Sequence, residues 1–456
     1  MASWREIRAK VLIGQAYARY PNDPARKIKL LSKAIAINPK SHDAYCLRGA
    51  EKYRAKDYNG AIADLDKALA IKPDMETAFF YRAGTYFAMR DFEAAIRDGL
   101  RLVQFTPDDY KVHFMCATAK INLNDYNGAL EDYSKVIRLV LPNKSKESQE
   151  SAYFALCGRA LAYFELEQID NALQDYETAI QLDPLGWVAY SDRARVYEKH
   201  GDMGAAIADL TTALGINSED SDIYLRRGKL LKKQKDYNAA IANFTEAIRL
   251  APNDANGYVE RALTYDFKED HASIIRDFSE AIRLKPDEWS WFTDRGVSRN
   301  KIGDLDGALA DFQQSRDLNP TSALVHSNLA SIYIQKDALN TALEYAEKAI
   351  ELDPTYHNGY NNRGEVYRLR GHYDAAIADF EEAQQCKPDS LYSFIGLALT
   401  HFKLGNIEQA RSFWTQALAL EPRYGDIDWV RNNPAHIKTF IADVEALLAA
   451  INRDGK

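Results

Sequence analysis

The chain has 456 residues, with 58 lysines and arginines against 66 aspartates and glutamates, so its formal net charge is −8. Apolar residues make up 46% and charged residues 27%, which is typical of a folded protein and excludes collagen-like and disordered chains. Because the charge balance is acidic, we do not expect a protein that coats nucleic acid or anionic lipid.

Two further features predict a cytoplasmic location. The first residues carry charges where a secretory signal needs an apolar core, and no stretch approaches the roughly 18 uninterrupted apolar residues of a membrane span. The four cysteines follow neither a metal-ligand nor a C-x-x-C spacing, and they are too few for a disulfide framework. They are Cys46, Cys116, Cys157 and Cys386. We expect them to be small buried side chains.

The prolines recur along the chain at a fixed interval. Eleven of the 14 mark one recurring corner, mostly 34 residues apart. They are Pro39, Pro73, Pro107, Pro142, Pro184, Pro252, Pro286, Pro320, Pro354, Pro388 and Pro422, and the one skipped site is Ser218. Length alone suggests about three domains, but a fixed period of 20–50 residues indicates one tandem array.

Each copy predicts two helices joined by a short turn and closed by the proline corner. With the proline numbered position 32, position 20 is alanine in ten of twelve copies, position 27 is alanine in nine, and position 8 is glycine or alanine in eleven. Position 16 carries a residue that can cap the second helix by accepting from an orphan backbone N–H. These residues are Asp23, Asp57, Asp91, Asp125, Asp202, Asp236, Asp270, Asp304 and Asn406.

Residues 45–73 and 360–388 display the pattern well, and it resembles the tetratricopeptide repeat, whose period is 34. The resemblance covers about residues 8–424 in twelve copies. It implies an all-α, right-handed superhelical solenoid of helix-turn-helix repeats. We expect repeats 1–4 in residues 1–142, a polar insertion in 143–152, repeats 5–12 in 153–424 and a C-terminal capping helix in 425–456.

Two segments break the repeat. Between Pro142 and Pro184 the interval is 42 residues, and 143–151 is polar. The insertion is either a longer corner loop or an extended helix start, or else a hinge or a loop that contacts a partner. After Pro422 an amphipathic run predicts a helix that covers the last repeat. Its apolar residues are Ile437, Phe440, Ile441, Val444, Leu447, Leu448 and Ile451.

Arginine at position 7 occurs together with aspartate at position 23. Seven copies carry both: Arg48 with Asp64, Arg82 with Asp98, Arg159 with Asp175, Arg193 with Asp209, Arg261 with Asp277, Arg295 with Asp311 and Arg363 with Asp379. An eighth pairs Arg227 with Asn243, and the exception is Asp132, whose repeat has Cys116 in place of arginine. We predict partly buried, structural ion pairs, either between the two helices of a repeat or between neighbouring repeats.

The sequence contains no motif for catalysis or for a cofactor. It has no phosphate-binding glycine loop, no H-E-x-x-H and no nucleophile elbow, and the histidines form no i,i+3 or i,i+4 pairs. We therefore expect no catalytic residue, no metal site and no cofactor.

The resemblance implies that positions 2, 5, 9, 12 and 13 of the first helices face a concave groove. Repeats 2–5 place apolar residues there: Tyr53, Phe80, Phe87, Phe114, Ile121, Phe154, Leu161 and Phe164. Repeats 6 and 7 place basic residues there or adjacent to it: Arg195, Lys199, Arg226, Lys229, Lys232 and Lys233. Repeats 8–11 are mixed and rich in amides: Asp266, Asn300, Asn358, Asn361, Glu365 and Arg368.

These zones leave several interpretations open. The apolar rings either pack against neighbouring helices, bind an apolar or amphipathic peptide, or support self-association. The basic zone is either a solvated helix face, a site for an acidic peptide or a C-terminal carboxylate, or a nuclear-import signal.

The interpretation we favour is a non-enzymatic scaffold that binds an extended or helical segment of another protein in its groove. The alternatives are binding of nucleic acid or another polyanion through the basic zone of repeats 6–7, which the acidic net charge makes a weaker hypothesis, and a regulatory subunit of a separate enzyme. No membrane partner is expected, and self-association stays open.

Overall fold

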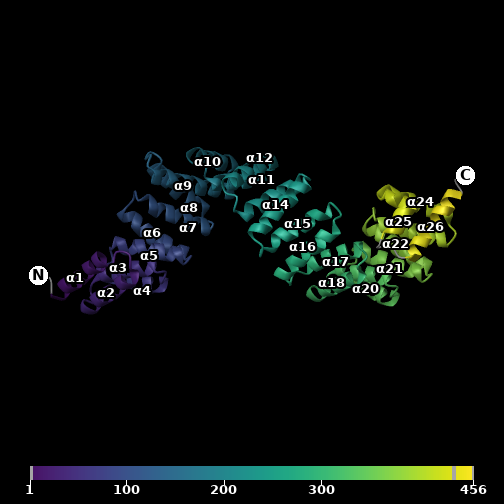
Figure 1. Ribbon diagram of the computed structural model, residues 1–456, viewed down its shortest axis with the longest axis horizontal. Coiled ribbons are helices and arrows are strands. Elements are labelled where there is room, and N and C mark those ends of the chain that lie inside the picture. Colours follow the sequence, from purple (N-terminus) through teal and green to yellow (C-terminus); the bar gives the residue numbers. More distant parts are fainter. Residues whose placement is uncertain (1–3, 434–437, 454–456) are drawn as a thin grey trace. The chain divides into compact units, whose positions relative to one another are not determined.

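The computed structural model describes residues 4–433 and 438–453, and every regular element in these ranges is a helix. The helices follow one another along the chain as hairpin pairs (Figure 1). This confirms the predicted all-α array of helix-turn-helix repeats. The chain divides into two compact units, residues 1–219 and 220–456.

Each unit holds six helix pairs. The first contains α1 (Trp4–Arg19), α2 (Pro24–Ile37), α3 (His42–Arg54), α4 (Tyr58–Ile71), α5 (Glu76–Ala88), α6 (Phe92–Phe105), α7 (Tyr110–Asn122), α8 (Tyr126–Val140), α9 (Lys146–Glu165), α10 (Ile169–Leu182), α11 (Trp187–His200) and α12 (Met203–Ile216). The second contains α13 (Ser221–Lys233), α14 (Tyr237–Leu250), α15 (Ala255–Asp266), α16 (His271–Leu284), α17 (Trp289–Lys301), α18 (Leu305–Leu318), α19 (Ala323–Gln335), α20 (Leu339–Leu352), α21 (His357–Leu369), α22 (Tyr373–Cys386), α23 (Leu391–Lys403) and α24 (Ile407–Leu420). It ends with the short 3-10 helix η1 (Pro422–Gly425), α25 (Ile427–Asn432) and α26 (Lys438–Arg453).

The turn inside each repeat combines a cap with a left-handed residue. Asp57 accepts a hydrogen bond from the Gly60 amide at 3.0 Å, and the aspartates at the same position of seven other repeats cap in the same way. Asn406 was predicted to cap α24 but makes no such side-chain bond. The residue before each cap has positive φ in eleven repeats, and in seven of them it is not glycine.

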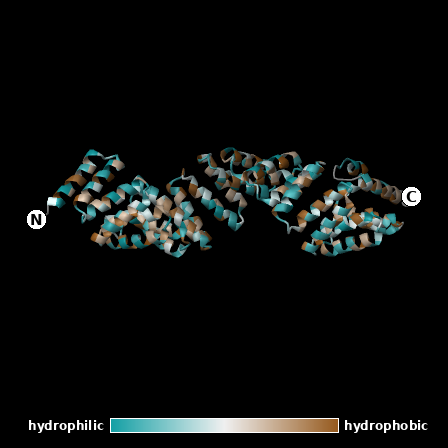
Figure 2. Cartoon of the chain, turned by 90° about the horizontal axis from the view of Figure 1, so that it is seen from below, coloured by the Kyte–Doolittle hydropathy of each residue, from teal (hydrophilic) through white to brown (hydrophobic). Residues whose placement is uncertain are grey.

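Small residues allow the helices to approach closely. Ala61 and Ala68 are fully buried, as are most of the alanines at the same two positions of other repeats. A Cβ added at Gly228 would lie 2.6 Å from the ring of Phe244, so the two helices of that repeat could not keep their spacing. Hydrophobic and hydrophilic residues alternate along the helices (Figure 2).

The arginine at position 7 binds the aspartate at position 23 with two parallel hydrogen bonds. Arg48 Nε donates to Asp64 Oδ2 at 2.8 Å, and Arg48 Nη2 donates to Asp64 Oδ1 at 2.6 Å. The other six predicted pairs have the same geometry at 2.6–2.9 Å. The seven carboxylates belong to buried residues that are 1–6% exposed. Each pair therefore joins the two helices of one repeat.

In five of these repeats the arginine also reaches the second helix of the preceding repeat. Arg48 Nη1 donates to Ser32 Oγ at 2.9 Å, and Arg295 Nη1 donates to Ser279 Oγ at the same distance. The corresponding acceptors of Arg82, Arg159 and Arg261 are Asp66, Ser134 and Thr245. One guanidinium thus connects three helices, which the sequence did not reveal.

The two irregular copies have physical explanations. Asp132, whose repeat lacks the arginine, accepts from Lys120 Nζ at 2.8 Å and lies 3.2 Å from His113 Nδ1. Arg227 Nε donates to Asn243 Oδ1 at 2.8 Å. Because this acceptor is neutral, burial lowers the pKa of Arg227, whereas the hydrogen bonds to Asp64 raise the pKa of Arg48.

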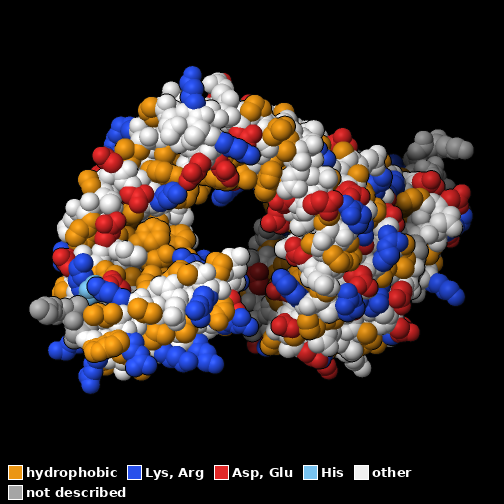
Figure 3. Space-filling model, turned by 60° about the vertical axis from the view of Figure 1, so that its left-hand side comes forward, with side chains coloured by type: hydrophobic (Ala, Val, Ile, Leu, Met, Phe, Trp, Pro, Cys, Tyr) orange, Lys and Arg blue, Asp and Glu red, His pale blue; other side chains and the backbone are white. Residues whose placement is uncertain are grey.

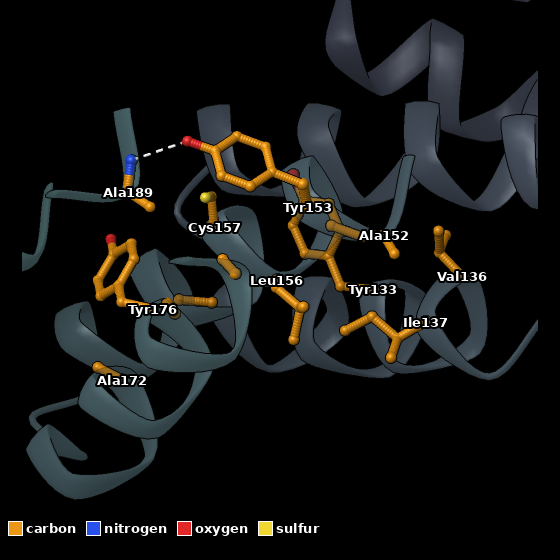
Figure 4. Packing of buried hydrophobic residues seen from close by; sticks show 14 of the residues in the cluster. Tyr133, Val136, Ile137, Ala152, Tyr153, Leu156, Cys157, Ala172, Tyr176 and Ala189 are labelled. Atoms are coloured by element: carbon orange, nitrogen blue, oxygen red, sulfur yellow. Dashed lines mark hydrogen bonds between the residues drawn. The ribbon is translucent and has the colours of Figure 1, made fainter. Parts of the chain in front are cut away.

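The polar insertion is largely helical. Ser145 caps α9, which begins at Lys146 and extends over 20 residues, so the segment is an extended helix start. Its inner face packs Ala152 and Tyr153 into a cluster with residues of α8 and α10 (Figure 4). Tyr153 Oη accepts from the Ala189 amide at 2.9 Å and donates to the Gly186 carbonyl at 2.9 Å. The boundary between the two units lies elsewhere, next to Ser218, the corner that lacks its proline.

Helix α26 covers the last repeat, as predicted for the C-terminal cap. Val444 and Leu447 are fully buried among residues of α23–α25. Polar contacts accompany this packing, because Asp443 pairs with both Arg368 and Lys403 at 2.5 Å. Arg368 was expected in the groove, but α26 covers it and leaves its side chain 1% exposed.

The arginine–aspartate pairs should be essential for stability. Replacing Arg261 by methionine leaves Asp277 as an unpaired buried charge, and we expect a loss of about 3–5 kcal/mol in unfolding free energy. The matched control is Arg283→Met in the same repeat, where the side chain is 60% exposed and pairs with Glu280 on the surface. There the loss should stay below about 1 kcal/mol.

Urea unfolding followed by circular dichroism compares the two variants. Equal losses would contradict a structural role for the buried pair. The double variant Arg261→Met/Asp277→Leu should recover part of the stability, because no charge is left unpaired.

Candidate functional site

A groove of about 880 Å³ lies wholly within the second unit. Its walls are the first helices of repeats 8–12, namely α15, α17, α19, α21 and α23, together with η1, α25 and the start of α26. The lining residues occupy mainly positions 2, 5, 6, 9, 12 and 13 of their repeats. The groove therefore coincides with the zone in which the sequence predicted mixed and amide-rich residues.

Amide and hydroxyl side chains dominate one wall. They are Asn300, Ser327, Asn328, Ser331, Gln335, Asn358, Asn361 and Asn362. Some are fixed by neighbours, since Asn362 Nδ2 donates to Ser327 Oγ at 2.8 Å and Asn361 Nδ2 donates to Ser390 Oγ at 3.2 Å. Asn300 Oδ1 and Asn328 Nδ2 are buried and have no hydrogen-bond partner among the described residues. These two amides retain hydrogen-bonding capacity.

Aromatic residues form the edge next to the C-terminal cap. Tyr392 on α23 is 57% exposed. Tyr424 and Trp429 form an edge-to-face pair with ring centroids 5.2 Å apart, and Phe440 packs edge-on against Tyr424 at 6.3 Å. The last three follow the final repeat, so the repeat pattern could not assign them to the groove.

Ion pairs at the margin of the groove connect the eighth repeat with the segment that follows the twelfth. Arg423 in η1 bonds Glu421 at 2.7 Å and lies 4.0 Å from Glu269, which precedes α16. The Arg423 guanidinium also lies over the Trp429 ring at 4.9 Å. Residues of the eighth repeat and of the segment after the twelfth therefore meet beside the groove.

Two carboxylates stand apart from these ion pairs. Asp266 ends α15 and lines the groove, and half-buried Asp294 lies on α17. Burial, with the charge of Asp266 adding to it, raises the pKa of Asp294 from 3.8 to about 6. No cation lies within 4.0 Å of either carboxylate in the described part of the chain.

The apolar residues predicted for the groove all lie in the first unit, and most contribute to packing. Phe164 is buried, with the cationic groups of Arg195 and Lys199 over its ring at 5.9 and 5.2 Å. Tyr53, Phe87, Phe114, Ile121 and Leu161 are partly buried. Phe80 and Phe154 are 46% and 44% exposed, and a peptide contact at these two rings stays a prediction.

The predicted basic residues are divided between the units, and at least four lie near carboxylates. Arg195 lies 3.9 Å from Asp192 and Lys199 lies 3.4 Å from Glu167 in the first unit. In the second unit Lys229 and Lys232 share Glu260, at 3.3 and 2.6 Å. Arg226 and Lys233 also make contacts. On the face drawn in Figure 3, basic and acidic side chains are interspersed.

The remaining reactive groups are not arranged for chemistry. Burial raises the pKa of Cys46, Cys116 and Cys157 to about 12, which leaves their thiols protonated and unreactive. No three histidine, cysteine or acidic side chains within residues 4–433 and 438–453 are grouped as metal ligands would be. None of the described helices combines the length and apolarity that a membrane crossing requires.

Comparison with known sequences gives matches to one family. Sequence models described as tetratricopeptide repeat match residues 153–184 and 221–254, residues 345–378, and residues 42–75 and 323–356. U-box domain-containing protein 70 of rice, Oryza sativa subsp. japonica, is 36% identical over 73 residues. That match spans 16% of this chain and only 9% of the rice protein.

The solved structures that are similar to the chain include the following two. The APC/C hetero-tetramer Cut9–Hcn1 is 14% identical with a TM-score of 0.46, over 99% of this chain and 97% of that one. The C-terminal part of a repeat protein from Cytophaga hutchinsonii is 19% identical with a TM-score of 0.46, over 55% of this chain and 99% of that one.

Asp294 should reduce the stability of the free protein at neutral pH. Its pKa is raised in the folded state, so folding is favoured while the carboxyl is protonated, and stability falls as the pH rises from about 4 through about 6. Asp294→Asn removes the buried charge. We therefore expect it to raise the thermal midpoint at pH 7.5 and to change it little at pH 4.

Thermal unfolding followed by circular dichroism at the two pH values measures this difference. Asp287→Asn, in the exposed corner before α17, is the control for a change of one charge. A lower midpoint for Asp294→Asn at pH 7.5 would mean that the carboxylate stabilises the fold, contrary to this prediction.

Proposed function

Because the chain is a tandem tetratricopeptide-repeat protein, we propose that it is a non-catalytic scaffold that holds an extended segment of another protein in the groove of its second unit. The observation that carries this proposal is a groove of about 880 Å³ with an amide wall and an aromatic edge. Its volume lies within the range of about 300–1,000 Å³ that is usual for ligand sites.

The amide wall favours an extended segment over a helical one. An asparagine side chain offers both a donor and an acceptor, which complement the N–H and C=O of a peptide unit. In a helix those backbone groups bond one another, whereas in an extended segment they are available to the groove. On the neighbouring first helices α17 and α19, the acceptor Oδ1 of Asn300 and the donor Nδ2 of Asn328 have no partner among the described residues.

The aromatic edge supplies the apolar part of the contact. Tyr392 has more than half of its surface exposed, and Trp429 lines the groove beside it. Tyrosine and tryptophan are enriched among residues that dominate binding energy, because they bury a large rigid surface. This edge would anchor a side chain while the amides hold the backbone.

The rival functions have less support. Four of the six basic residues on which a polyanion site would depend lie within 4.0 Å of carboxylates. A regulatory subunit of a separate enzyme is compatible with the scaffold, since the bound segment could belong to that enzyme.

The test uses the full chain and a phage-displayed library of random decapeptides. Peptides that are enriched are resynthesised, and their affinity is measured by fluorescence anisotropy. Combining Asn300→Ala, Asn328→Ala and Tyr392→Ala should weaken binding at least about tenfold, because each residue contributes a hydrogen bond or an apolar contact.

The control combines Gln314→Ala and Asn340→Ala, which lie exposed on the second helices α18 and α20. This variant should bind like the wild type, and both variants should keep the wild-type thermal midpoint. If no peptide is enriched, or if the groove variant binds as tightly as the control, the proposed function is wrong.

A further inference from the structure

Most charged side chains around the groove already have partners of opposite charge. Glu421 and Glu269 flank Arg423 at 2.7 and 4.0 Å, and Glu365 bonds the buried Arg368 at 2.8 Å. Asp266 lines the same groove but pairs with no cation among the described residues. It is therefore an uncompensated negative charge on the groove wall.

Asp294 on α17 is a second carboxylate, close enough to Asp266 for the charge of Asp266 to act on it. It stands 34 residues before Asn328 and 68 before Asn362, at the same repeat position, and both asparagines line the groove. Asn362 has a local partner, since it donates to Ser327, 35 residues earlier. The residue 35 before Asp294 is Val259, which has no polar side chain. Asp294 therefore lacks the neighbour that serves Asn362. The carboxylate at the same position of the preceding repeat, Glu260, bonds Lys229 and Lys232 at 3.3 and 2.6 Å, whereas Asp294 pairs with no cation among the described residues.

Lys301 also lines the groove. It lies seven residues after Asp294 on α17, which is about 10 Å along the helix axis, and it forms no ion pair with either aspartate in the described chain. Neither aspartate is therefore neutralised by an ion pair among the described residues, and the groove is negative beside α15 and α17.

We propose that the protein segment held in this groove carries a lysine or arginine whose cationic group binds between Asp266 and Asp294. This inference rests on the proposed function and specifies the chemistry of the partner. A half-buried carboxylate next to a second one is unfavourable in the free protein, as the raised pKa of Asp294 reflects. A bound cation removes that repulsion, so part of the binding free energy comes from relief of a destabilised site.

The test starts from the decapeptides that the wild-type chain enriches. Those peptides should share one basic position, and replacing that residue by norleucine should weaken binding about tenfold or more, as expected for a charge-assisted hydrogen bond. The variant Asp266→Asn/Asp294→Asn should bind the original peptide about as weakly as the wild type binds the norleucine peptide. When the Asp266→Asn/Asp294→Asn variant binds the norleucine peptide, its affinity should be no lower than that of either singly altered complex.

The control is Asp287→Asn/Glu288→Gln, which removes the same two charges from an exposed corner of the same unit. This control variant should still bind the basic peptide more tightly than the norleucine peptide. That result would show that the basic residue pairs locally with Asp266 and Asp294 and is not simply attracted by the negative charge of the unit. Enriched peptides without a basic position, or an aspartate variant that still discriminates lysine from norleucine, would overturn this inference and leave the proposed function intact. Failure to enrich any peptide would overturn both.

Discussion

The bidentate bond between an arginine and an aspartate sixteen residues later fixes the geometry on which the rest of the structure depends. It joins the two helices of a repeat, and in five repeats the same guanidinium reaches the second helix of the repeat before. A planar guanidinium with several donors can hold three helices at once, whereas a lysine cannot bond bidentately. Aromatic residues three positions earlier, such as Tyr45 below Arg48, cover the face of the guanidinium.

Because the bond recurs in most repeats, successive repeats stack in a similar way and their first helices together form one surface. When successive repeats stack in the same way, equivalent positions of their first helices line one groove, and each substitution changes the groove at one known place. Asp294, Asn328 and Asn362 occupy one such position in three consecutive repeats. The regular repeats determine the shape of the groove, and the residues that differ between repeats determine which chemical groups line it.

Much of this architecture could be predicted from the sequence, but the open part of the groove could not. The prolines and the covariation of Arg261 with Asp277 specify the repeat and its buried pairs. Whether the predicted apolar side chains are open to a peptide depends on their exposure, and neighbouring helices determine that exposure. Phe164, for example, is covered by Arg195 and Lys199. At the other end Trp429 belongs to a segment without any repeat signature, so its place beside the groove follows only from the packing of η1, α25 and α26.

A crystal structure of the full chain with one enriched decapeptide would show where the bound segment lies and in which conformation. We expect an extended peptide in the groove of residues 220–456, with its backbone bonded to Asn300 and Asn328 and its basic side chain between Asp266 and Asp294. A peptide bound as a helix, or bound to the first unit beside Phe80 and Phe154, would contradict this expectation.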